Sequence, residues 1–301
     1  MNYDNNKNIK NILFLGDITG RLGRQVCRDF ILFLKNNKGK SVCELLEEIS
    51  KDSSAIKLNT NLDIIPDIDF IIANGENASG GFGLTQKNYN DLISFGINAL
   101  TSGNHIWDKK DIFSYIDDAD RLIRPINYPD TLPGMGYRIF DVANFKLAII
   151  SLLGRTFMPV INSPFEVLPD IINKIKEITP NIFIDIHAEA TAEKICMGHW
   201  LSNLDISCIV GTHTHVQTSD EKIINGKSAY ITDVGFCGAY DSVIGMSYET
   251  SLQKLSLGLN LKHEVIKSGI GEANAIIVSI DMSSGVATSI SRINYYKNYN
   301  L

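Results

Sequence analysis

The stretch Ile206-Ser-Cys-Ile-Val210-Gly-Thr-His213-Thr-His215 joins an apolar run to two histidines that stand two residues apart. The run 206–210 is typical of a buried strand. Side chains at positions i and i+2 of an extended segment point the same way, so we expect both imidazoles to project together beyond the strand end. Neutral imidazole is a good ligand for zinc, iron, manganese or nickel. A lone His-x-His pair is a weak indication of metal binding, and the rest of the chain has to decide.

Length and composition predict one globular domain. The chain has 301 residues, of which 44% are hydrophobic and 21% are charged, and many α/β domains of this length fold as one unit. We see no internal repeat, low-complexity tract or linker, so we predict a single domain over residues 1–301. The net charge of −6 argues against stable binding to nucleic acid, whose affinity depends on neutralising phosphates.

Apolar segments and cysteines indicate a cytoplasmic protein. No apolar run approaches the ~18–20 residues that span a bilayer, and the apolar segment before Gly16 is too short and wrongly flanked for a signal peptide. The five cysteines are scattered and odd in number, without C-x-x-C spacing, which predicts buried thiols in a reducing compartment. We expect no contact with a membrane, and a homo-oligomer is compatible with the sequence.

Polar side chains of ligand type follow several predicted strands. In open α/β sheets, ligand sites lie at the carboxyl ends of the strands. Each of these residues taken alone is an ordinary turn or capping residue. Together they would converge at one edge of one sheet, and they therefore predict a metal site. The strands and the residues after them are Asn11–Leu15 with Asp17, Phe70–Ala73 with Glu76 and Asn77, Ile97–Thr101 with Asn104 and His105, and Ile182–Ile186 with His187.

Periodicity and turn signals predict the remaining elements. The expected helices are 22–33, a short one after a capping box at 41–44, 85–95 between the cap Thr85 and the stop Gly96, 108–116 with Asp108 as N-cap, and 167–178. The further expected strands are 145–153, 229–232, and an antiparallel pair at 273–280 and 286–293. The expected loops are 51–61 and 121–137.

The number of candidate ligands favours two metal ions. Three imidazoles, two carboxylates and up to two carboxamides exceed the ~3–4 protein ligands of a single zinc site. Two ions ~3.5–4 Å apart can hold a hydroxide between them and clamp the attacking and leaving oxygens of a phosphoryl displacement. Glu76 is the carboxylate best placed to bridge such a pair. The glycines that follow it lack the Walker spacing of a phosphate-binding loop.

Four sequence blocks resemble those of the calcineurin-like metallophosphoesterases, and within them the bacterial YmdB-type phosphodiesterases. The resemblance extends from about Ile12 to Ile293 and implies an α/β sandwich of two mixed β-sheets flanked by helices. The blocks are Gly16-Asp17-x-x-Gly20, Asn74-Gly-Glu76-Asn77, Gly103-Asn104-His105 and Gly211-Thr-His213-Thr-His215.

The resemblance implies a role for each candidate residue. One metal would be held by Asp17, Glu76, Asn77 and His215, and the other by Asn104, His187 and His213 with Glu76 shared. His105 would be the proton donor. The chemistry agrees, because an imidazole beside a ligand asparagine can reach a leaving oxygen without binding the metal. A positioned histidine contributes ~10²–10⁴-fold to such a reaction.

Two features depart from the wider superfamily. Its usual Asp-x-His is here Asp17-Ile18-Thr19, and its bridging aspartate is Glu76. Both match the YmdB-type branch, and the missing imidazole makes the first site harder, which favours iron or manganese over zinc. The polar segment 36–63 is longer than the usual connection in the family. We interpret it as a surface insertion without effect on the site.

The resemblance implies hydrolysis of cyclic nucleotides, with 2',3'-cyclic nucleotides opened to 3'-nucleotides. An alternative is a regulatory cyclic-nucleotide-binding protein with slow hydrolysis, but the intact His105 favours catalysis. A dinuclear amidohydrolase would need its ligands in a different strand order. His199 and His263 lie outside the blocks and are expected to be structural or on the surface. Arg155 could meet a phosphate bidentately, and a structural salt bridge is the alternative.

Overall fold

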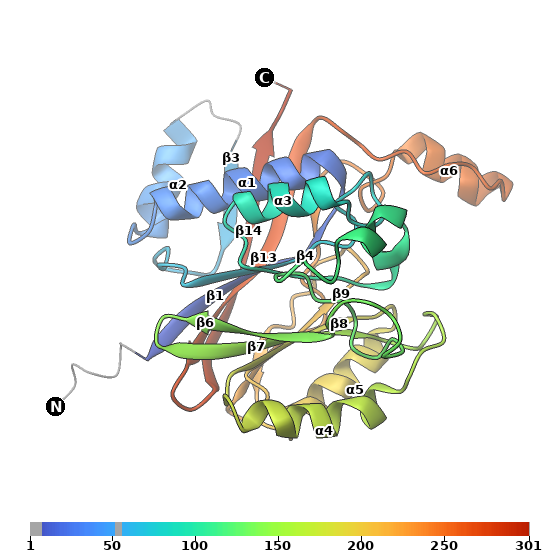
Figure 1. The fold of residues 1–301 in the computed structure, drawn as a ribbon. Helices are drawn as coiled ribbons and strands as arrows, with labels where there is room; N and C mark the ends of the chain where they lie inside the picture. The colour runs from blue at the N-terminus through green and yellow to red at the C-terminus, as the bar shows by residue number, and fades with distance from the viewer. Residues whose placement is uncertain (1–7, 52–55, 301) are drawn as a thin grey trace.

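Two β-sheets stack face to face in the computed structural model, which describes residues 8–51 and 56–300, and helices cover both outer faces (Figure 1). The predicted α/β sandwich of two mixed sheets is confirmed. No helix in these two ranges is long and apolar enough to cross a bilayer.

The first sheet has eight strands and carries the N-terminal half of the site. β1, β4 and β5 run parallel, while β13 is antiparallel to β1, β12 and β14. The strands are β2 (Asp17–Ile18), β12 (Phe236–Ala239), β13 (Ile270–Asp281), β1 (Ile9–Leu15), β4 (Phe70–Asn74) and β5 (Ala99–Thr101), with β14 (Val286–Asn298) beside β13 and β3 (Ile56–Thr60) beside β14.

The second sheet has six strands, of which β7, β8, β9 and β11 are parallel. Its spatial order is β10 (Lys222–Ile224), β11 (Ser228–Ile231), β9 (Cys208–Thr212), β8 (Ile182–His187), β7 (Phe145–Leu153) and β6 (Tyr137–Val142). In the β8–β9 ladder His187 pairs with Thr212, so the two candidate histidine segments leave the sheet side by side.

Alternating side chains of buried strands build separate cores on the two faces of each sheet. In β1, Phe14 packs between the sheets and stacks on Phe183 at 5.3 Å, whereas Leu13 and Leu15 face the helices. The outer helices of the first sheet are α1 (Gly20–Asn36), α2 (Val42–Lys51) and α3 (Gln86–Ser94), and those of the second are α4 (Pro164–Lys176) and α5 (Thr191–Ser202). α6 (Tyr248–Leu257) has no buried residue and projects from the body (Figure 1).

The candidate residues lie at the ends of both sheets, so the expectation of one edge of one sheet is wrong. Asp17, Glu76 and Asn104 follow β1, β4 and β5 of the first sheet. His187 ends β8 and His213 follows β9, both in the second sheet. The order of strands along the chain did not reveal this division, because β1, β4 and β5 are parallel in one sheet and β8 and β9 are parallel in the other.

The predicted loop 51–61 is wrong for Lys51, which ends α2, and for residues 56–60, which form β3, while 52–55 lie outside the described residues. β3 pairs antiparallel with β14 at the sheet edge, where Leu58 lies opposite Tyr295. Its sequence IKLNT buries Leu58 while the flanking lysine and asparagine are exposed, so its apolar pattern is too short to recognise. α2 confirms the short helix after the capping box.

The predicted helix 108–116 is also wrong. Two short 3₁₀ turns stand there, η2 (Asn104–Trp107) and η3 (Lys110–Ser114), and Asp108 closes the first instead of starting a helix. Its carboxylate binds the ring of His105 instead of capping backbone amides. β6, β10, β12, α5 and α6 were not predicted. Thr85 does cap α3, accepting from the backbone N–H of Asn88.

Candidate metal centre

The segment after β9 does not stay extended. β9 ends at Thr212, and His213 and His215 have φ angles of 100° and 66°. These left-handed conformations are unfavourable for residues other than glycine and occur where surrounding structure enforces them, often at functional sites. The argument from i and i+2 spacing is therefore wrong for this pair. Instead, His213 contacts His187, and His215 contacts Asn77.

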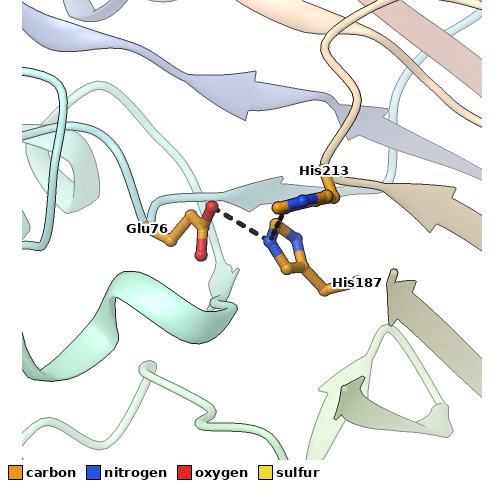
Figure 2. A group of neighbouring side chains, drawn as sticks. All are labelled: Glu76, His187 and His213. Carbon is orange, nitrogen blue, oxygen red and sulfur yellow. Dashed lines mark hydrogen bonds and ion pairs between the residues drawn. The ribbon is translucent and has the colours of Figure 1, made fainter. Parts of the chain in front are cut away.

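Acceptor atoms crowd around one nitrogen of the fully buried His187. Its Nε2 lies 3.0 Å from Glu76 Oε1, 3.1 Å from Asn104 Oδ1 and 3.0 Å from His213 Nδ1. Figure 2 shows Glu76, His187 and His213 pointing toward one another from different parts of the fold. One ligand atom from each of the three lies within 4.8 Å of the others. This arrangement is able to hold a metal ion.

Hydrogen bonds behind His187 determine its tautomer. The buried Asp185 accepts from Asn74, Thr101 and the hydroxyl of Thr212, the last at 2.8 Å. Because that hydroxyl donates its proton to Asp185, it accepts from His187 Nδ1 at 2.9 Å. When the ring is neutral, the Nε2 lone pair is therefore on the crowded side. Carboxylate relays of this kind orient metal-binding histidines.

Gly103, before Asn104, permits the close approach within this cluster. A Cβ atom at this position would stand 2.2 Å from Glu76 Oε2 and 2.4 Å from His187 Nε2. No side chain fits there without moving a buried carboxylate and a buried imidazole. The glycine of the Gly-Asn-His block therefore leaves the space that the candidate ligands share.

A second group contains Asp17, Asn77 and His215. Asp17 Oδ2 accepts from the backbone N–H of His213 at 2.8 Å, and His215 Nε2 lies 3.2 Å from Asn77 Nδ2 and 3.8 Å from Asp17 Oδ2. Within the described residues, Asp17 Oδ1 and Asn77 Oδ1 are buried without any hydrogen-bond partner. Leaving such an acceptor unsatisfied costs ~1–3 kcal/mol. A cation beside these oxygens would remove that cost, so the donor set fits a metal.

Burial and neighbouring charges shift the pKa values of the two carboxyl groups and of His187. Burial raises the pKa of Asp17 well above its ordinary value. Burial acts the same way on Glu76, but the imidazole of His187 outweighs it and lowers the pKa to about 2. Burial opposes protonation of His187, yet the Glu76 and Asp17 carboxylates raise its pKa to about 9. These two carboxylates therefore favour a positive charge at His187, either a proton on the ring or a metal ion beside it.

His213 differs from His187 in its protonation. Burial, with the neighbouring His187 adding to it, lowers the pKa of His213 to about 3. The ring is therefore neutral at pH 7 and offers a lone pair. Burial also lowers the pKa of His215. Both rings of the opening motif are in the form that binds metals.

His105 stands at the border of the cluster. Its backbone N–H donates to Glu76 Oε2 at 3.2 Å, whereas its partly exposed ring is held through Nδ1, 2.8 Å from Asp108 Oδ2. The ring packs edge-on against Phe82 at 4.9 Å. With Nδ1 engaged, Nε2 remains free for proton transfer. The role of Asp108 was missed because its position before an apolar stretch resembles an N-cap.

A buried ion pair supports the strained loop. Lys194 Nζ donates to Asp233 Oδ2 at 2.7 Å and to the Thr212 carbonyl at 3.0 Å. The same carboxylate accepts from the backbone N–H and the hydroxyl of Thr214 at 3.2 and 2.8 Å. The pair therefore holds the loop on both sides of His213. The sequence offered no signal for Lys194, since a helical lysine is usually solvated.

The remaining candidates lie outside the cluster. His199 is exposed on α5, as expected. His263 is also exposed, but its ring lies 5.5 Å from that of Phe82, the residue that contacts His105. Arg155 is exposed, and its backbone N–H, not its guanidinium, donates to Glu193 at 2.9 Å.

Known proteins resemble this chain over nearly its whole length. The YmdB-like protein family matches residues 57–293. The chain belongs to the YmdB-like family. Among the relatives of this chain, the 2',3'-cyclic-nucleotide 2'-phosphodiesterase of Bacillus subtilis (strain 168) is 39% identical over 282 residues, which cover 94% of this chain and 96% of the relative.

Two solved structures share the architecture of this YmdB-like chain. A hypothetical protein from Thermus thermophilus superposes with a TM-score of 0.78 at 28% identity, over 95% of this chain and 99% of that one. A protein described as a novel phosphatase from Mycoplasma pneumoniae gives 0.77 at 30% identity, over 96% and 95%. The predicted family and the predicted class of enzyme, a phosphoesterase, are confirmed.

Proposed function

We propose that the protein is a dinuclear metal-dependent phosphodiesterase that opens 2',3'-cyclic nucleotides to 3'-nucleotides. The observation that carries the metal dependence is the pair of orphaned oxygens, Asp17 Oδ1 and Asn77 Oδ1, next to the acceptors crowded around His187. Buried charges and acceptors without donors are stabilised by cations. The substrate is suggested by the name of the Bacillus subtilis relative.

The two groups of side chains divide the proposed ligands between two ions. The first ion would bind Asp17, Glu76, Asn77 and His215, and the second Asn104, His187, His213 and the shared Glu76. Oxygen atoms outnumber imidazoles among the proposed ligands of the first ion, which favours iron or manganese. When bound, two such ions supply charge neutralisation at the phosphoryl oxygens and an activated water nucleophile.

Protein groups supply the proton and its position. His105 Nε2 would donate to the 2' oxygen as its bond to phosphorus breaks, which leaves the phosphate on the 3' oxygen. Asp108, 2.8 Å from Nδ1, keeps the ring in the orientation that exposes Nε2. A protein that merely bound cyclic nucleotides would have no use for an oriented acid, so this pair favours catalysis over a regulatory binding role.

The experiment that tests the proposal combines metal analysis with a substrate screen. Purified protein should contain about two metal ions per chain, with iron or manganese among them, and should hydrolyse a 2',3'-cyclic nucleotide to the 3'-nucleotide. 3',5'-Cyclic nucleotides and bis(4-nitrophenyl) phosphate serve as comparison substrates, and phosphorus NMR distinguishes 3'- from 2'-nucleotide products. Full activity after exhaustive chelation, or production of the 2'-nucleotide, would contradict the proposal.

We also propose that the enzyme is cytoplasmic. All five cysteines are free, and Cys43 and Cys196 are exposed, which corrects the expectation of buried thiols for these two. Exposed free thiols persist in reducing compartments. Fractionation of cells that express the full chain tests this location, and recovery outside the cytoplasm would refute it.

A further inference from the structure

A pocket of about 340 Å³ lies beside the candidate metal centre, with His215 and Phe236 in its wall. The His215 ring stacks on that of Phe236, with centroids 5.3 Å apart. His215 therefore belongs to both the second ligand group and the pocket. Pockets of ~300–1,000 Å³ with a few convergent polar groups are typical of small-molecule sites. None of the roles assigned above uses this pocket.

Two tyrosines and one carboxyl group give the pocket its chemistry. Tyr240, after β12, and Tyr296, on β14, meet edge to face with ring centroids 5.3 Å apart. Glu272 on β13 lies directly opposite Tyr296 in the antiparallel ladder, so both side chains are on the same face of the sheet. Aromatic rings beside a hydrogen-bonding group are the usual means of holding a nucleobase by stacking and edge contacts.

Most other polar groups of the pocket are already engaged. Asn294 Nδ2 donates to Gln217 Oε1 at 2.8 Å and to Asn274 Oδ1 at 2.6 Å. Gln217 Nε2 donates to the carbonyls of Val234 and Ala275. The carboxyl of Glu272 is the acidic group of the pocket. It has the Asn274 amide as a hydrogen-bond partner, and a carboxylate, with about four acceptor positions on its two oxygens, can accept further hydrogen bonds from a ligand. Guanine presents two adjacent donors, N1–H and the 2-amino group, which match the two oxygens of a carboxylate.

We infer that this pocket is the base-binding subsite of the enzyme and that Glu272 gives it a preference for guanine. The inference rests on the proposed function, because the phosphate must occupy the metal centre for the base to reach the neighbouring pocket. Tyr240, which is 56% exposed at the rim, stacks on the base, and Glu272 accepts from its donor edge. A carboxylate accepting two hydrogen bonds from guanine discriminates by about tenfold or more against bases that lack this pattern.

The test measures kcat/KM at pH 8, where Glu272 is ionised, for the 2',3'-cyclic forms of guanosine, adenosine, cytidine and uridine. The unaltered enzyme should prefer guanosine over uridine by about tenfold or more. In Glu272→Gln this ratio should fall toward one, and because it is taken within one variant, any loss of active protein cancels. Glu264→Gln, at an exposed position outside the pocket, is the matched control and should keep the ratio. Tyr240→Ala should raise KM for every nucleotide by about tenfold through lost stacking.

Binding provides a second readout that does not depend on turnover. Calorimetry with 3'-GMP and 3'-UMP on the metal-loaded protein should show the same preference and its loss in Glu272→Gln. Equal rates for all four bases with equal affinities for the two nucleotides, or a preference for adenosine or a pyrimidine, would overturn the subsite while leaving the phosphodiesterase intact. Absence of hydrolysis with every diester would overturn the proposed function, and guanine-selective binding would then still support the pocket.

Discussion

Two glutamates at the same end of the molecule have opposite environments. Glu76, in the metal centre, is surrounded by the imidazole of His187 and by donors from Asn77 and the backbone of His105, and its pKa falls to about 2. Glu272, in the neighbouring pocket, faces tyrosine rings, and burial raises its pKa to about 7 although the Asn274 amide opposes the shift. The same residue type is thus held as an anion in one place and becomes an anion only near pH 7 in the other.

The difference shows what makes a buried carboxyl a candidate metal ligand. Both side chains lose water, which disfavours the charged form. Only beside Glu76 do neighbouring groups compensate for that loss, and they do so by attracting positive charge. Ionised Glu76 therefore stabilises the fold above its ordinary pKa of 4.5, and this contribution is lost as the pH falls toward 2. Ionisation of Glu272 instead lowers the free energy of unfolding, because burial raises its pKa to about 7.

The largest expected effect is that of Glu76→Gln. The amide keeps the shape but removes the negative charge that both proposed ions share. We expect bound metal to be lost and activity to fall by about 10³-fold or more, since charge stabilisation by metals amounts to several kcal/mol. Metal analysis and kinetics on the same preparation provide the measurement. Retention of both ions at normal stoichiometry would show that Glu76 is not the bridging ligand.

His105→Ala should separate the acid from the metal centre. Its ring binds Asp108 and not the clustered acceptors, so the metal content should stay unchanged while kcat falls ~10²–10⁴-fold. With an ester that has an acidic leaving group, such as bis(4-nitrophenyl) phosphate, kcat should fall less, because the leaving oxygen needs no proton. His199→Ala on the exposed side of α5 is the control. A variant at the unaltered rate would remove His105 from the mechanism.

Thr212→Val should lower the affinity for one of the two proposed ions selectively. The substitution removes the hydroxyl that links His187 to Asp185, and loss of such an outer partner lowers metal affinity ~10–100-fold. The orphaned oxygens of Asp17 and Asn77 do not depend on this link, so a metal titration should resolve one weakened and one normal site. Thr288→Val on the exposed face of β14 is the control. Equal weakening of both sites would contradict the division into two groups.

Glu272→Gln should have the smallest effect, and it should depend on pH. In the folded protein the acid ionises near pH 7 instead of 4.5, so its contribution to stability is complete below pH 4.5 and lost as the pH rises through 7. The glutamine cannot ionise. The free energy of unfolding of the variant, relative to that of the unaltered protein, should therefore rise between pH 4.5 and 7 and reach a gain of about 1–3 kcal/mol above pH 7. Denaturant titrations at pH 4, 6 and 8 measure it, and a constant difference would argue against the raised pKa.

Much of the fold was predictable because its strands are buried on both faces and stand out as apolar runs. β1, β4, β7, β8 and β9 were found in this way, as were the alternating strands β13 and β14. The edge strands β3 and β10 were not, since strands of five and three residues are too short for a recognisable pattern. α5 escaped because apolar residues are spread around it, so its sequence lacks the one-sided pattern expected of a surface helix.

The residue types of the site and their places at strand ends were predictable from the sequence. The residues that support them from behind were not. Asp17, Glu76 and His187 could be singled out because chemistry-bearing side chains directly follow apolar runs. No sequence pattern singles out Asp185, Lys194 and Asp233, although their hydrogen bonds hold His187 and the loop around His213. Their importance arises from burial and from partners far away in the chain.

The sequence by itself determined which side chains are available at the strand ends and which family they belong to, because both depend on local patterns. The tertiary structure decided that those ends come from two sheets and that the opening histidines leave the strand in left-handed conformations. It also decided that His213 and His215 belong to different groups. The reason is physical: direction and protonation of a side chain depend on neighbours that packing brings together, and no local spacing records them.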